Sequence, residues 1–135
     1  MFEMLLGHLI GDYLFQTDKM ALNKSKNSLY GWLMCFIHTM IYSSTICIMM
    51  NKPDTKWFFL VFMSHFPIDK FSLANYWMKM MGKITPMDYY KQFKYDVVNP
   101  MDHLTASFSS IVYCVVDNTL HLVLMYFGWR ILYGQ

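Results

Sequence analysis

The feature that most constrains this chain is the recurrence of apolar segments long enough to cross a lipid bilayer. A transmembrane helix needs about 20 residues, with a range of about 17–25. Four segments of the 135-residue chain reach this length, at about residues 1–17, 28–50, 57–79 and 103–130. The composition agrees, because only 15% of the residues are charged, against about 25% in soluble domains. The sequence predicts an all-α, integral membrane four-helix bundle that forms a single domain over residues 1–135.

The long polar connection between the third and fourth segments carries a helix signal of its own. Thr85 stands where an N-cap is expected, Pro86 takes the first helical position, and Asp88 takes the third. Apolar side chains then follow at roughly helical spacing, at Met87, Tyr90, Phe93 and Val97. We therefore expect a short amphipathic helix on the membrane surface, ending at Asn99–Pro100.

Basic residues are unevenly distributed between the two predicted sides of the membrane. The loops after the first and third segments carry Lys19, Lys24, Lys26, Lys70, Lys79, Lys83, Lys91 and Lys94, and the opposite side carries Lys52, Lys56 and Arg130. The positive-inside rule then places these lysine-rich loops in the cytoplasm and both termini outside. The net charge is only +2 and the lysines lie in loops, which argues against a nucleic-acid partner.

Ionisable side chains lie near the centre of every apolar segment. They are His8 and Asp12, His38, His65 and Asp69, and Asp117 and His121. Each pair is spaced i, i+4, which puts both members on one helix face. An ionised Asp near a bilayer centre costs about 2.5–3.5 kcal/mol, and no predicted segment offers a Lys or Arg at matching depth. In a four-helix bundle the four sets would meet in one layer.

These seven side chains match the ligand set of a divalent metal centre. Histidine with carboxylate suits Zn²⁺, the ion we expect, and also admits Mn²⁺ or Fe²⁺. Seven candidates exceed one tetrahedral shell, so we expect one or two ions, a pair being bridged by a carboxylate at about 3.5–4 Å. Gln16 and Asn118 are expected to orient ligands or contact substrate. A proton or ion pathway and purely structural polar contacts are the alternatives.

The pattern of these residues resembles a family of short bacterial and phage integral membrane proteins of unknown function. That pattern reads H-L-x-x-D-x-x-x-Q-T-D near the N-terminus, a second-span His, H-x-x-x-D-x-x-K in the third span and D-x-x-L-H in the last. The third-span Lys departs from this spacing here, because Lys70 directly follows Asp69. The corresponding positions here are His8–Asp12 with Gln16–Asp18, then His38, His65–Asp69 and Asp117–His121. More distantly, the pattern is similar to inner-membrane metal-dependent hydrolases of the LexA-regulated type. The resemblance implies a multi-pass protein of the bacterial inner membrane and, by analogy, a hydrolase.

We therefore expect a membrane-embedded metal-dependent hydrolase. Its catalytic carboxylates would be Asp12, Asp69 and Asp117, and its substrate a lipid-linked phosphate ester whose headgroup contacts Lys24 and Lys70. One alternative is a metal or proton channel or carrier that uses the same cluster. Another is a small effector that oligomerises and perturbs the membrane. Polar side chains at mid-depth and toward the cytoplasm, with few in the outer halves, favour the enzyme. The expected partner is membrane lipid. The sequence does not decide whether the chain also forms a homo-oligomer.

Overall fold

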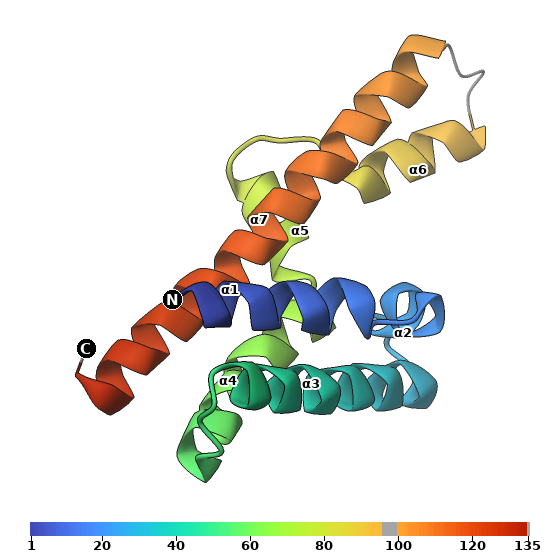
Figure 1. The fold of residues 1–135 in the computed structure, drawn as a ribbon. Coiled ribbons are helices and arrows are strands. Elements are labelled where there is room, and N and C mark those ends of the chain that lie inside the picture. Colours follow the sequence, from blue (N-terminus) through green and yellow to red (C-terminus); the bar gives the residue numbers. More distant parts are fainter. Residues whose placement is uncertain (96–99, 135) are drawn as a thin grey trace. The chain divides into compact units, whose positions relative to one another are not determined.

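The computed structural model describes residues 1–95 and 100–134, and within these ranges the chain is all-α, as predicted. The elements are α1 (Phe2–Leu9), a π-helical turn (Ile10–Leu14), α2 (Asp18–Asn23), α3 (Leu29–Met49), α4 (Thr55–Lys70), α5 (Leu73–Met80), α6 (Pro86–Tyr95) and α7 (Pro100–Tyr133) (Figure 1). The chain divides into two compact units, Met1–Ser72 with His121–Gln135, and Leu73–Leu120. The single domain expected over residues 1–135 stays a prediction.

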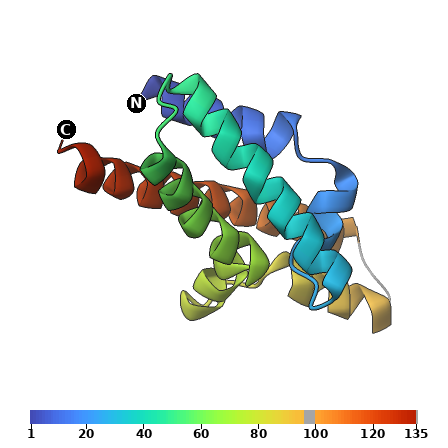
Figure 2. The same cartoon turned by 90° about the horizontal axis from the view of Figure 1, so that it is seen from below.

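Helix α3 is the centre of the first unit. It packs against α1 on one side and α4 on the other (Figure 2), and α2 also contacts it. Gly11 allows the close approach of the first segment, because a Cβ atom there would lie only 2.7 Å from Cδ2 of Tyr42. The buried core combines side chains of α1, α3, α4 and the end of α7: Met4, Tyr42, Ile46, Cys47, Trp57, Val61 and Met125.

Polar side chains fix where several helices begin. The Ser28 hydroxyl accepts the backbone N–H of Gly31 at the start of α3, as the sequence predicts. Asp54 caps α4 by accepting the N–H of Lys56 at 2.8 Å. These caps satisfy backbone donors that have no partner within the helix.

The predicted third span, residues 57–79, is broken in the structure. Helix α4 continues through Pro67 but ends at Lys70, and α5 starts only at Leu73. Between them Ser72 takes a left-handed conformation with φ 50°, and its N–H donates to the Asp69 carbonyl at 3.3 Å. A left-handed residue that bonds back to the last turn is a common way to end a helix.

The first predicted span is likewise not one regular helix. Helix α1 ends at Leu9, and the π-helical turn that follows contains Asp12. At the end of this turn the Phe15 N–H donates a hydrogen bond to the Ile10 carbonyl at 3.0 Å. Single π-helical turns occur frequently at functional sites.

Within residues 1–95 and 100–134, two helices are long and apolar enough to cross a membrane, namely residues 29–49 of α3 and residues 101–133 of α7. Length and composition alone are a weak criterion, since the core helix of a soluble protein also meets it. Helix α1 has 8 residues and α4 has 16, so the four predicted spans are not confirmed. The multi-pass topology and its orientation stay predictions.

The second unit contains the predicted helix of the polar connection. Helix α6 begins at Pro86, and Thr85 and Asp88 cap it reciprocally: the Thr85 N–H donates to Asp88 Oδ2 at 3.1 Å, and the Asp88 N–H donates to the Thr85 hydroxyl at 3.4 Å. The expected helix start is confirmed. The expected end at Asn99 lies outside the described residues, and α7 begins at Pro100, earlier than predicted.

Candidate metal centre

Six of the seven predicted ligands belong to the first unit and meet there. They are His8 on α1, Asp12 on the π-helical turn, His38 on α3, His65 and Asp69 on α4, and His121 on α7. All four imidazoles are at most 2% exposed. Asp117 lies four residues before His121 on α7, in the second unit. Its part in the centre stays a prediction.

Asp12, His38 and His65 form the first group of candidate ligands, the Asp12 group. The Nε2 atoms of His38 and His65 lie 3.0 Å apart. Asp12 Oδ1 lies 3.1 Å from His38 Nε2 and 3.6 Å from His65 Nε2. Three donor atoms from three separate elements therefore form a compact triangle.

His65, Asp69 and His121 form the second group, the Asp69 group. Asp69 Oδ2 lies 3.1 Å from His65 Nε2, and Asp69 Oδ1 lies 3.6 Å from His121 Nε2. The His65 and His121 rings stack with centroids 4.0 Å apart. Asp69 Oδ2 is also 3.1 Å from His38 Nε2. The two groups thus share His65, and His38 of the first group also lies next to Asp69 of the second.

The spacing of these atoms fits a bound divalent ion. In a tetrahedral Zn²⁺ site with Zn–N bonds of about 2.0–2.1 Å, neighbouring ligand atoms lie about 3.3 Å apart, close to the observed 3.0–3.6 Å. Both carboxylates are buried against imidazole nitrogens: Asp12 Oδ1 lies 3.1 Å from His38 Nε2, and Asp69 Oδ2 lies 3.1 Å from His38 Nε2 and from His65 Nε2. Buried charges in proteins are paired or coordinate metals, so this crowding of nitrogen and oxygen atoms suits a cation among them.

Lys24, which the sequence assigns to a substrate headgroup, contacts one of the predicted ligands in the structure. Lys24 follows the short helix α2, and its Nζ lies 2.9 Å from Asp69 Oδ2, with side-chain exposures of 15% for Lys24 and 1% for Asp69. Because Lys24 lies in a loop, its position along the sequence gave no sign of this depth. The ammonium therefore neutralises part of the carboxylate charge.

Lys70 holds the loop that carries Lys24. Its Nζ donates to the Lys26 carbonyl at 2.8 Å and to the Lys24 carbonyl at 3.3 Å. The same nitrogen lies 4.3 Å above the Trp32 ring, a cation–π contact. Lys70 is only 4% exposed, so in this structure it supports the loop; its predicted contact with a headgroup stays a prediction.

The sequence model of a family described as "Protein of unknown function (DUF3307)" matches residues 1–133. The chain belongs to this family. No curated protein and no solved structure matches it. The predicted resemblance to a family of unknown function is confirmed, whereas the likeness to LexA-regulated hydrolases and the bacterial or phage origin stay predictions.

Tyr42 is a member of the centre in this DUF3307 chain that sequence reasoning missed. Its hydroxyl lies 2.7 Å from His8 Nδ1, and its ring stacks on His65 with centroids 3.7 Å apart. Its position four residues after His38 was the available signal, because i, i+4 residues share a helix face. A tyrosine within an apolar segment is easily read as an interfacial aromatic instead.

The two predicted supporting amides differ in what they contact. Gln16 Nε2 lies 3.0 Å from His38 Nε2, the same nitrogen that faces Asp12 and His65, so its predicted role in orienting that ligand stays a prediction. The Asn118 side chain donates to the Cys114 carbonyl, one turn earlier on α7, at 2.6 Å. Asn118 belongs to the second unit, and its predicted role stays a prediction.

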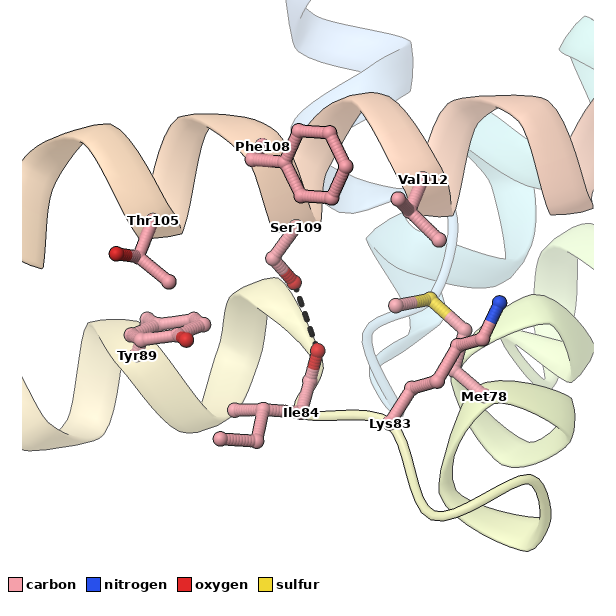
Figure 3. Close-up of a pocket in the computed structure, with 8 residues that line it drawn as sticks. All are labelled: Met78, Lys83, Ile84, Tyr89, Thr105, Phe108, Ser109 and Val112. Carbon is pink, nitrogen blue, oxygen red and sulfur yellow. Dashed lines mark hydrogen bonds between the residues drawn. The ribbon is translucent and has the colours of Figure 1, made fainter.

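The second unit contains an apolar cavity of about 420 Å³ between α5, α6 and α7 (Figure 3). Met78, Ile84, Phe108 and Val112 supply most of its apolar lining, and the Ser109 hydroxyl donates to the Ile84 carbonyl at 2.7 Å on one wall. Lys83 is the one charged side chain among its lining residues. None of the predicted metal ligands lines this cavity.

Proposed function

We propose that this chain is a membrane-embedded, metal-dependent hydrolase that acts on a lipid-borne phosphate ester. The observation that carries the proposal is the Asp12 group, in which two histidine nitrogens and one carboxylate oxygen lie 3.0–3.6 Å apart in a buried position. Two histidines and a carboxylate are the protein ligands of many hydrolytic Zn²⁺ sites, where the remaining position binds water. Mn²⁺ and Fe²⁺ suit the same donors.

Support for the membrane setting comes from the surface of α3. The large apolar side chains of Leu33, Phe36 and Met40 follow at helical spacing and are exposed. A row of exposed apolar side chains needs a partner such as lipid or protein. The proposed topology has four spans, with the first and third loops in the cytoplasm, in a bacterial inner membrane.

The proposed chemistry divides the work between the ion and the chain. Asp12, His38 and His65 would hold a divalent ion, which when bound would activate water near neutral pH and offset negative charge on a phosphoryl oxygen. The chain supplies the ligands, excludes bulk water and places a cation at the edge of the centre. Lys24 is that cation, because its ammonium lies beside Asp69 and its side chain is partly exposed. A lysine binds phosphate as a point charge.

The test begins with the full chain purified in detergent. We expect bound divalent transition metal by elemental analysis, and release of phosphate from phosphatidic acid in mixed micelles that stops after chelation and returns with Zn²⁺ or Mn²⁺. His38→Ala should abolish both, while His103→Ala, at an exposed position on α7, should leave both unchanged. No metal on the purified chain, and none after titration, would refute the proposal.

The same preparation also separates an enzyme from a carrier. Metal that binds at His38 without any phosphate release, together with metal uptake into proteoliposomes, would replace the hydrolase with a carrier that uses the same cluster. Phosphate release without uptake supports the hydrolase.

A further inference from the structure

We infer that the centre holds a single divalent ion, bound by the Asp12 group, and that the ammonium of Lys24 occupies the place of a second ion at the Asp69 group. This inference rests on the proposed metal-dependent function and makes it more specific. The number of candidate ligands would also allow a pair of ions. Instead, one ion binds, and the ammonium of Lys24 takes the place of the second.

The first argument is that the two groups share a ligand. His65 belongs to both groups, and its Nε2 is the atom near Asp12 and near Asp69, at 3.6 and 3.1 Å. A neutral imidazole nitrogen has one lone pair to offer a metal. The Nε2 atom of His65 can therefore ligate an ion at one of the two groups but not at both.

The second argument is that Asp69 already has a cation. Lys24 Nζ lies 2.9 Å from Asp69 Oδ2, the distance of a charge-assisted hydrogen bond. An ion bound to the same oxygen would sit about 2.0–2.2 Å from it. The ammonium and the ion would then be neighbours of like charge in a buried position, which is strongly unfavourable.

The third argument is the balance of charge within the first unit. Asp12 and Asp69 together carry two negative charges when ionised. One divalent ion and Lys24 carry three positive charges, which exceed them by one. A second ion would raise this excess to three, and uncompensated buried charge is costly.

The fourth argument is that the fold fixes the position of Lys24. The Lys70 ammonium donates hydrogen bonds to the backbone carbonyls of Lys24 and Lys26 in this loop. Gly31 leaves the space for this loop, because a Cβ atom at residue 31 would lie 2.2 Å from the Lys26 carbonyl oxygen. These contacts fix the backbone of the loop from which the Lys24 side chain reaches Asp69.

The test measures binding rather than activity. The metal-stripped full chain is titrated with Zn²⁺, and the Mn²⁺-loaded chain is examined by electron paramagnetic resonance, in which two ions about 3.5–4 Å apart would couple. We expect one Zn²⁺ per wild-type chain and an uncoupled Mn²⁺ spectrum. Lys24→Gln should bind the ion at least about tenfold more tightly, because a repelling charge is removed, or should accept a second ion.

Two variants serve as controls. Lys24→Arg keeps the charge and should retain wild-type stoichiometry and affinity. Lys26→Gln removes a neighbouring exposed lysine whose Nζ contacts Asn23 Oδ1 at 2.8 Å, and it should also match the wild type. Circular dichroism checks that each variant is folded.

Three results would overturn the inference. Two coupled ions in the wild-type chain would do so while leaving the proposed metal-dependent function standing. Equal or weaker binding by folded Lys24→Gln, without a second ion, would also do so. A wild-type chain that binds no ion would remove the proposed function and this inference together.

Discussion

The Nε2 atoms of His38 and His65 lie 3.0 Å apart, and each histidine is only 1% exposed. The two residues are on α3 and α4, the helix pair at the centre of the first unit. Without a metal, a distance of 3.0 Å corresponds to a hydrogen bond in which one Nε2 is protonated and donates to the other. With a metal at the Asp12 group, both nitrogens would serve as ligands. His38 belongs to the Asp12 group alone and His65 to both candidate groups, so substitutions around this pair can separate ligand roles from packing roles.

Replacing Asp12 by Asn should weaken metal binding. The amide keeps the size of the carboxylate but loses its charge, and Asn is a poor ligand for these ions. We expect the Zn²⁺ affinity to fall at least about tenfold, the low end of the loss seen for residues that merely support ligands. Titration of the stripped chain measures it. Asp88→Asn, which changes the cap of α6 in the second unit, is the matched control. Full affinity in folded Asp12→Asn would remove Asp12 from the centre.

Replacing Tyr42 by Phe should affect both stability and metal binding. The variant loses the hydroxyl that lies 2.7 Å from His8 Nδ1 and donates to Met125 Sδ at 3.4 Å. A lost buried hydrogen bond costs about 0.5–1.5 kcal/mol in free energy of unfolding. His8 Nδ1 also lies 3.4 Å from Asp12 Oδ2, so a misaligned His8 should disturb this ligand and lower metal affinity about tenfold. Thermal unfolding and Zn²⁺ titration test this. Tyr30→Phe, at an exposed position on α3, should change neither, and equal results for the two variants would contradict the role of Tyr42.

Replacing Gly31 by Ala should destabilise the loop that carries Lys24. The added Cβ would lie 2.2 Å from the backbone oxygen of Lys26, which cannot move without breaking its bond to Lys70. Overpacking of this kind costs about 1–3 kcal/mol in free energy of unfolding. Gly128→Ala is the control, because its Cβ would meet the flexible end of Leu60 and should cost less. A larger loss for Gly128→Ala would contradict the close packing at Gly31.

The contact between Tyr133 and Asp54 should make stability depend on acid pH. The Tyr133 hydroxyl donates to Asp54 Oδ2 at 2.6 Å, and this bond lowers the pKa of Asp54 below its usual 3.8. A lowered pKa stabilises the fold above the unfolded pKa, and this contribution disappears as the pH falls through the folded pKa. Tyr133→Phe should therefore lower Tm near pH 7, and its Tm should converge with that of the wild type once the pH has fallen through the lowered pKa of Asp54. A difference in Tm that stays constant across this range would contradict the assignment.

Topology can be tested by labelling single cysteines in a background where Cys35, Cys47 and Cys114 are replaced by alanine. We expect a cysteine at Ser25 or Met87 to be protected from an impermeant reagent added outside, because both lie on the predicted cytoplasmic side. A cysteine at Lys56 should react. All three positions are exposed in the structure. Outside labelling of Ser25→Cys would reverse the orientation.

Local patterns predicted those parts of the fold that depend on nearby residues. The start of α6 follows from Thr85, Pro86 and Asp88, because capping involves side chains within one turn. The break after Lys70 was missed, since the apolar composition continues through Phe71 and Leu73 while the left-handed Ser72 ends the helix. Composition reports which side chains avoid water, but a single backbone angle decides whether a helix continues.

The sequence by itself determined the helical class and a set of histidines and aspartates spaced to share helix faces, because helical periodicity is a local property of the chain. Only the tertiary structure decided what those faces meet. It placed Lys24 on Asp69, 45 residues further along the chain, and the Tyr42 hydroxyl against His8 Nδ1. It also brought the Lys70 ammonium within hydrogen-bond distance of the Lys24 backbone carbonyl. Such contacts depend on how separate helices pack, and no spacing within one segment encodes them.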